Sequence, residues 1–174
     1  MRIEPIELVE IELKNDPTIP KTKWTIHRLS YDQTKNVEMQ VGPRPVQAFF
    51  IYGRVHPART REEIEEERKL PADEQKKRVD NRVNEALNRL RKLSESDRAS
   101  YDIAIDWLER YDFAVCAQGL ELIDAKPAGN VYEVLNEMRP VESVRVVVGE
   151  LANKITKLAE IEDEKKEPSP SPAG

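Results

Sequence analysis

Two histidines and one cysteine are the side chains with the greatest potential for chemistry. Neither His27 nor His56 has a second histidine or a cysteine at the spacing of a metal site. Cys116 lies in an apolar helical pattern, where a small packed side chain is more common than a reactive thiol. We therefore expect no metal and no cofactor, and we interpret His27 as a surface or edge residue of a strand.

The motifs of nucleophilic and phosphate-binding enzymes are absent from the sequence. It contains no G-x-S-x-G, no P-loop and no G-x-G-x-x-G, and its six glycines leave few for a loop that cradles phosphate. The acidic runs at residues 62–67 and 160–167 are close to lysines and arginines, which is typical of solvated helix faces. The sequence therefore predicts that the protein is not an enzyme.

Basic and aromatic residues occur together in residues 49–69, as they do on an RNA-binding sheet. They are Phe49, Phe50, Tyr52, Arg54, Arg59, Arg61 and Lys69. Acidic residues are interleaved with them, and the whole chain has 28 basic and 33 acidic residues, a net charge of -5. Since nucleic-acid binders usually present a basic face, we do not expect nucleic acid as the main partner.

Composition indicates one domain, or one domain with a small appended layer, in a reducing compartment. The chain has 174 residues, of which 39% are hydrophobic and 35% charged. Its single cysteine cannot form an internal disulfide, and glutamates interrupt the apolar positions of the N-terminal segment. The apolar run at residues 48–52 is far too short to cross a bilayer. We therefore expect a cytosolic protein without a membrane partner.

Two strands are predicted near the N-terminus. Residues 6–13, I-E-L-V-E-I-E-L, nearly alternate between apolar and acidic residues with a one-residue slip, which predicts a strand with a bulge. Alternation returns in residues 22–29, with Trp24 and Ile26 on one side. We expect this second strand to pair with the first.

The N-terminal part is predicted to contain one helix and one more strand. Ser30 is placed to cap a short helix over residues 31–39. Residues 46–55 are rich in aromatic and β-branched side chains, which predicts a third, better buried strand. Residues 1–57 are therefore interpreted as a β-rich part.

The remainder of the chain has helical periodicity and ends in a charged, proline-rich tail. Helices are predicted at about residues 60–69, 72–93, 95–118, 131–138 and 141–164. Between the third and fourth of them lies a short extended piece with a turn. Residues 58–164 are interpreted as a mainly α-helical bundle, and residues 165–174 as a disordered tail. The predicted fold class is α+β, with a small antiparallel β layer followed by this bundle.

Two apolar stripes are the candidate partner-binding residues. The helix at 95–118 has the widest apolar face and is expected to form the centre of the core. If it satisfies the core, the stripes on the helices before and after it are left to oligomerise or to hold a partner helix. The stripes consist of Val79, Val83, Leu87 and Leu90, and of Val144, Val147, Val148, Leu151, Ile155 and Leu158.

Three segments resemble a tail assembly chaperone of long-tailed bacteriophages. They are TKWTIHRLS at residues 22–30, the helix at 95–118 followed by GLELIDAKPAG, and NVYEVLNEMRPVESVRVVVGELANKITKL at residues 130–158. Together they cover about half of the chain. Residues 59–77 have no counterpart in this resemblance.

The resemblance implies a role in virion assembly in the host cytoplasm. Such chaperones coat the helical tape-measure protein, keep it soluble, recruit tail-tube protein and are absent from the finished particle. A frameshift often lengthens a minority of their chains, and Lys165 and Lys166 could be encoded by a slippery run. We also expect a homo-oligomer. Two alternatives stay open: a structural or adaptor subunit of the phage, and a nucleic-acid-binding regulator that uses residues 54–61.

Overall fold

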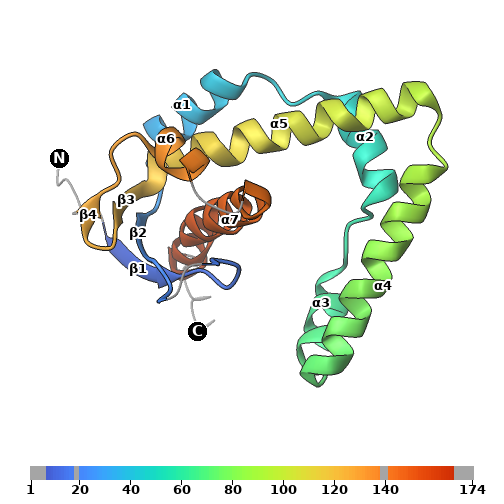
Figure 1. Cartoon of the computed structure of the whole chain (residues 1–174), viewed down its shortest axis with the longest axis horizontal. Coiled ribbons are helices and arrows are strands. Elements are labelled where there is room, and N and C mark those ends of the chain that lie inside the picture. The colour runs from blue at the N-terminus through green and yellow to red at the C-terminus, as the bar shows by residue number, and fades with distance from the viewer. Residues whose placement is uncertain (1–6, 18–19, 138–140, 167–174) are drawn as a thin grey trace, which may run out of the picture. The chain divides into compact units, whose positions relative to one another are not determined.

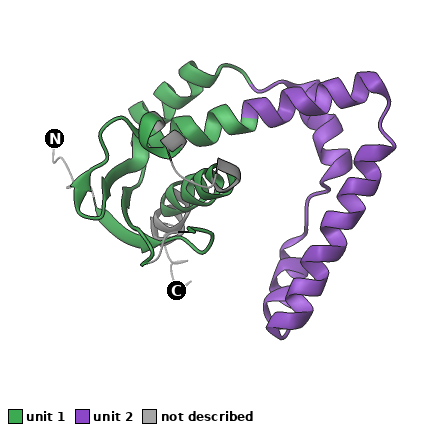
Figure 2. Cartoon of the chain, viewed as in Figure 1, with its two compact units in different colours: residues 1–43, 108–174 green, residues 44–107 purple. Residues whose placement is uncertain are grey.

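The computed structural model describes residues 7–17, 20–137 and 141–166, and its chain divides into two compact units (Figures 1 and 2). Unit 1 consists of residues 1–43 and 108–174, and unit 2 of residues 44–107. The division predicted at residue 57 is therefore not where the chain separates. Unit 2 is instead an insertion, and helix α5, Glu95–Gly119, begins in it and ends in unit 1.

A small antiparallel sheet forms one layer of unit 1, and with the helices it confirms the α+β class. Its strands are ordered β1 (Leu8–Glu12), β2 (Lys23–His27), β3 (Leu120–Ile123) and β4 (Lys126–Pro127). The first two strands pair as expected, whereas the other two come from the chain after α5. Sequence periodicity identified each extended piece, but not that they would join into one sheet.

The predicted bulge in the first strand is wrong. The β1 and β2 register runs without a break from Leu8 opposite His27 to Glu12 opposite Lys23. The irregularity occurs instead where β2 pairs with β3, between Thr25 and Ile26. Leu8 is 54% exposed, so the apparent slip reflects an apolar residue on the solvent side rather than an inserted one. Residue 6 lies outside the described residues.

The helices of unit 1 are α1 (Tyr31–Val41), the second half of α5, α6 (Val131–Glu137) and α7 (Val141–Lys166). Ser30 caps α1 as expected, because its hydroxyl accepts from Gln33 N and the Gln33 side chain accepts from Ser30 N. Helix α7 contacts β2 and α6, and lies beside the sheet in Figure 1. The tail was expected to begin at residue 165, but Lys165 and Lys166 are the last residues of α7. The rest of the expected tail, residues 167–174, lies outside the described residues, as does Met138, which was expected on the buried side of α6.

The core of unit 1 is built from both parts of the chain. Its most buried large apolar side chains are Leu13, Trp24, Ile26, Val37, Val115, Leu135, Val147, Val148, Leu151 and Ile155. The second half of α5 contributes Ala114, Val115 and Cys116, each at most 1% exposed. This half of the helix has the central position that its wide apolar face predicted.

Unit 2 contains α2 (Val46–Val55), α3 (Arg61–Arg68), α4 (Ala72–Arg91) and the first half of α5. The strand predicted at residues 46–55 is wrong, because this segment is α2. Its buried residues Ala48, Ile51 and Val55 recur at three and four, the period of one helix face. Periodicity therefore outweighed the aromatic and β-branched composition that favoured a strand.

Thr60 and Ser94 begin helices as the sequence indicates. The Thr60 hydroxyl accepts from Glu63 N, and the Glu63 carboxylate accepts from Thr60 N, forming a capping box for α3. The Ser94 hydroxyl accepts from Asp97 N at the start of α5. Among the described residues, no helix combines the length and the apolar character needed to cross a bilayer.

Candidate functional site

A groove of about 590 Å³ runs along one side of α4 within unit 2. Its α4 wall carries Val79, Val83, Ala86, Leu87 and Leu90. The facing wall comes from the segment between α2 and α3, from α3 itself and from Tyr101 of α5. The first predicted stripe therefore lines a groove, together with Ala86.

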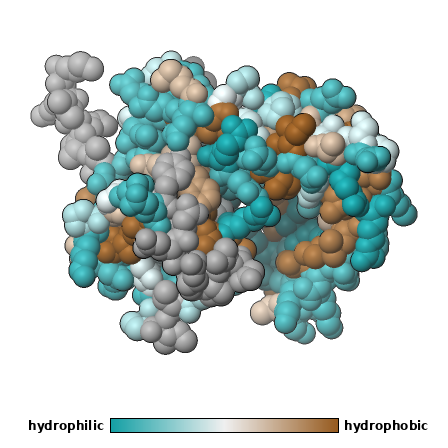
Figure 3. All heavy atoms as spheres, turned by 45° about the horizontal axis from the view of Figure 1, so that its top comes forward, coloured by the Kyte–Doolittle hydropathy of each residue, from teal (hydrophilic) through white to brown (hydrophobic). Residues whose placement is uncertain are grey.

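The apolar side chains of this groove remain open to solvent. Val79 is 44% exposed, Val83 52% and Leu87 45%, and neither α3 nor α4 has a buried residue. Leu90, nearer α2, is half-buried. The view in Figure 3 shows a mainly hydrophilic surface with separate hydrophobic patches. Because burying apolar surface is favourable, covering this stripe would stabilise a complex with a partner.

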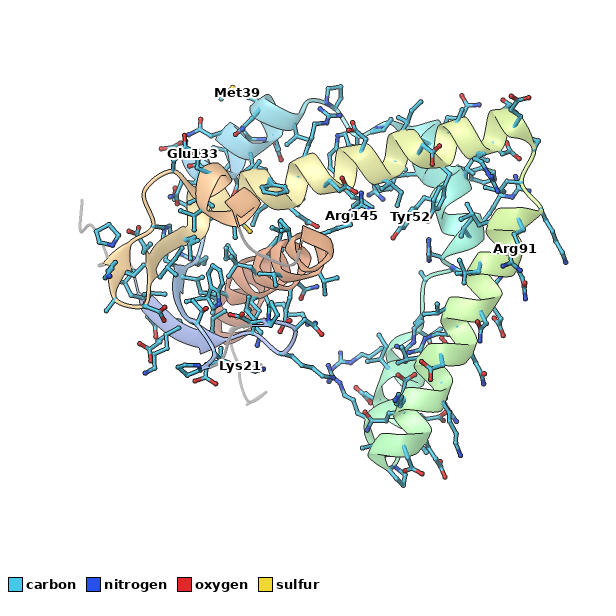
Figure 4. The ribbon with its side chains drawn as sticks, in the orientation of Figure 1. Lys21, Met39, Tyr52, Arg91, Glu133 and Arg145 are labelled. Atoms are coloured by element: carbon cyan, nitrogen blue, oxygen red, sulfur yellow. The ribbon has the colours of Figure 1, made fainter. Side chains whose placement is uncertain are left out.

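Two of the residues that line the groove, His56 and Tyr101, belong to a cluster of rings with Tyr52. His56 Nε2 lies 2.8 Å from the Tyr101 hydroxyl, and the Tyr52 and Tyr101 rings stack at 5.9 Å. Tyr52 projects from α2 (Figure 4). Burial, and then the charge of Arg89, lower the pKa of His56, so its ring is neutral at pH 7. The His56 ring therefore adds an uncharged aromatic surface to this part of the groove.

A shared carboxylate holds α3 against α4. Glu67 accepts from both terminal nitrogens of Arg82, the Nη2 contact being 2.9 Å, and from Arg59 Nη2 at 2.8 Å. Its side chain is only 13% exposed. The hydrogen bond from Arg82, with the charges of both arginines, lowers the pKa of Glu67. Glu67 is thus a structural carboxylate rather than part of the solvated face predicted for residues 62–67.

The second predicted stripe is buried except at its last residue, Leu158. Val144, Val147, Val148, Leu151 and Ile155 are all at most 7% exposed. Leu158 is half-buried. They pack in the core of unit 1, where α7 meets β2, α6 and the end of α5. We therefore correct the sequence-based assignment and place the candidate partner surface on α4 alone.

His27 is also not where the sequence suggested. It is 2% exposed on β2, a central strand, so its interpretation as a surface or edge residue is wrong. Its Nδ1 lies 2.8 Å from the Arg28 carbonyl oxygen and its Nε2 3.2 Å from Glu121 Oε1. Because both ring nitrogens are engaged within the sheet layer, His27 has a structural role.

Cys116 is a packed side chain, as its helical setting indicated. It is fully buried, and its thiol donates to the Val148 carbonyl oxygen at 3.6 Å. Burial, with the nearby Asp112, raises the pKa of the thiol, which keeps it protonated and unreactive. Within the described residues, no three His, Cys, Asp or Glu side chains are grouped to hold a metal ion.

The basic and aromatic residues considered for RNA do not form a sheet face. They lie on helices α2 and α3 and on the segments that follow these helices. Phe49 packs edge-on against Trp107 at 5.4 Å. Arg54 pairs with Asp97 at 3.3 Å and Arg61 with Glu65 at 3.1 Å. The sheet face with which these residues were compared is therefore not formed by this segment.

Comparison with known proteins gave no relative. No family model matches the chain, and no curated protein or solved structure matches it either.

Proposed function

We propose that this protein is a non-enzymatic tail assembly chaperone that acts in the host cytoplasm, binds a helix of the tape-measure protein in the α4 groove, and recruits tail-tube subunits. The observation that supports the binding role is the exposed stripe of Val79, Val83 and Leu87 along the groove. A stripe at helical spacing in a groove suits the apolar face of another amphipathic helix.

The size of the stripe favours weak binding at many sites. Complete burial of one valine or leucine side chain stabilises by about 1.5–3 kcal/mol, so covering three that are already half-covered yields about 3 kcal/mol. The stripe from Val79 to Leu90 extends over about 16 Å, three turns of a helix. One groove alone therefore binds weakly, and a long helix gains affinity by engaging several copies. This behaviour suits a chaperone that must later be released.

Co-expression with the tape-measure protein of the same phage tests the proposal. We expect the wild-type chain to keep the tape-measure protein soluble and to co-purify with it. Val83→Asp should weaken this capture at least tenfold, because a carboxylate would be buried against the partner's apolar face. Val83 is already 52% exposed, so the substitution should leave the fold intact.

Val146→Asp is the matched control. Val146 is 50% exposed on α7 in unit 1, so it repeats the chemistry of the substitution on a helix outside the groove. If the two variants capture the tape-measure protein equally well, the groove is not the binding site. Mass spectrometry of finished particles separates the chaperone from the structural or adaptor alternative, since only a chaperone is absent there.

A further inference from the structure

An arginine row follows one edge of the α4 stripe. We propose that the groove selects an amphipathic helix with acidic residues along the edge of its apolar face that lies against Arg78, Arg82 and Arg89. This inference rests on the proposed function and specifies the chemistry of its partner.

The geometry of α4 places these arginines on the α3 side of the groove. Arg82 and Arg89 follow Arg78 by four and eleven residues, spacings that return to the same side of a helix. The ion pair of Arg82 with Glu67 shows that this side faces α3. The opposite edge of the stripe is mixed in charge, with Lys76, Asp80, Asn84 and Arg91.

The carboxylates that line the groove already have partners. Glu67 accepts from two arginines, Glu63 accepts from Thr60 N at 2.8 Å, and Glu85 accepts from Arg89 at 3.0 Å. Of the three, Glu67 is the most enclosed, at 13% exposed, whereas the Glu85 side chain is 62% exposed. An approaching helix therefore meets the exposed Arg78 and the partly exposed guanidinium groups of Arg82 and Arg89, beside the already paired Glu85.

The arginines retain donors for a partner. Each guanidinium has five N–H groups. Arg82 and Arg89 each donate one hydrogen bond from each terminal nitrogen within unit 2. The Arg82 side chain is 38% exposed and that of Arg89 42%, and Arg78 is also exposed. Four arginines and three glutamates line the groove, an excess of one positive charge in a chain whose net charge is -5. Carboxylates on the partner complement this local excess.

The same charges disfavour a second copy of α4 as the occupant. Helix α4 contains six lysines and arginines against four aspartates and glutamates. Two copies would therefore bring two basic helices together, in either orientation. An acidic helix from another protein relieves this repulsion instead of adding to it.

Three synthetic peptides test the inference on the purified full-length chain. They share one apolar heptad stripe of three or more turns and carry Glu, Gln or Lys at the flanking positions. We expect the Glu peptide to bind about fivefold to tenfold more tightly than the Gln peptide at low salt, and the Lys peptide most weakly. Fluorescence anisotropy measures these affinities, and about 0.5 M salt should remove most of the difference.

Arg78→Glu and Lys77→Glu form a matched pair for this assay. Both change the charge by the same amount on adjacent residues of α4, but Lys77 does not line the groove. Arg78→Glu should abolish the preference for the Glu peptide, and Lys77→Glu should preserve it. Equal effects of the two variants, or equal binding of the Glu and Gln peptides, would overturn the inference.

The outcomes separate this inference from the proposed function. If all three peptides bind equally and Val83→Asp weakens each of them, the groove binds helices without selecting charge, so only the inference fails. If no peptide binds the wild-type chain, the inference fails, while the proposed function is decided separately by capture of the tape-measure protein with the Val83→Asp and Val146→Asp variants. Self-association through α4, lost in Val83→Asp and not displaced by the Glu peptide, would also overturn the inference by identifying a second copy as the occupant.

Discussion

Gly119, the last residue of α5, is packed too closely against α7 to accept a side chain. A Cβ atom at this position would lie 2.6 Å from Ile155 Cγ2 and 3.0 Å from its Cδ1. Ile155 is fully buried, so its side chain has no open space into which it can move. We therefore predict that Gly119→Ala destabilises unit 1.

The magnitude follows from two opposing effects. Forcing an extra methyl group into a packed core costs about 1–3 kcal/mol. Alanine is more favourable than glycine within a helix by up to about 1 kcal/mol, but Gly119 lies at the helix end, where this gain is smaller. The net expectation is a loss of about 1–2 kcal/mol in the free energy of unfolding.

Gly149→Ala provides the matched control. Gly149 lies within α7, and a Cβ atom there would approach only Asp112 Oδ2, at an ordinary contact distance of 3.5 Å. The same substitution should therefore stabilise the protein, by up to about 1 kcal/mol. Urea denaturation followed by circular dichroism measures both variants against the wild type.

A double-mutant cycle identifies the cause. Ile155→Ala removes each of the side-chain atoms that a Cβ at Gly119 would approach, so the cost of Gly119→Ala should largely disappear in that background. If Gly119→Ala is neutral or stabilising in the wild type, the close approach of α5 and α7 is refuted. An unchanged cost in the Ile155→Ala background would show that the loss arises elsewhere.

Two further predictions concern the stability of unit 1. Burial, and then the charge of Glu109, raise the pKa of Asp112 to about 6. Between about pH 4 and pH 6 the folded chain therefore holds a proton at Asp112 that the unfolded chain has lost. The free energy of unfolding falls as the pH rises through this range. After a discount for partial solvent exposure we expect the free energy of unfolding to fall by about 1 kcal/mol. This pH dependence should be absent in Asp112→Asn and retained in Asp102→Asn, a control on the same helix. Parallel pH profiles of Asp112→Asn and the wild type would contradict the prediction. In the turn between β3 and β4, Ala125 has a φ of 62°, a left-handed conformation that glycine adopts more easily than alanine. Ala125→Gly should therefore raise the free energy of unfolding by about 1 kcal/mol. A loss of stability would argue against the left-handed conformation at Ala125.

Local signals in the sequence identified most of the elements. Polar caps at Ser30, Thr60 and Ser94 marked helix starts that the structure retains, and Gly119 marked the end of α5. These signals are reliable because a cap satisfies backbone groups of its own helix, whatever packs against it.

Residue composition predicted secondary structure less reliably than the spacing of apolar residues where the two disagreed. Residues 46–55 were expected to form a strand from their aromatic and β-branched content, and they form α2. His27 was expected at an edge, but β3 returns from a distant part of the chain and makes β2 a central strand. Strand partners so far apart in sequence leave no local trace in either segment.

The two apolar stripes show which properties the sequence determined and which depended on the tertiary structure. The sequence by itself determined that α4 and α7 each have an apolar face, because a helical period of 3.6 residues aligns side chains three and four apart. Only the tertiary structure decided that the α7 face is buried by the sheet, α5 and α6, while the α4 face, beside the smaller α2 and α3, remains half-exposed along a groove. The physical reason is that burying apolar surface is favourable and non-directional, so a stripe requires a partner surface but does not specify which one.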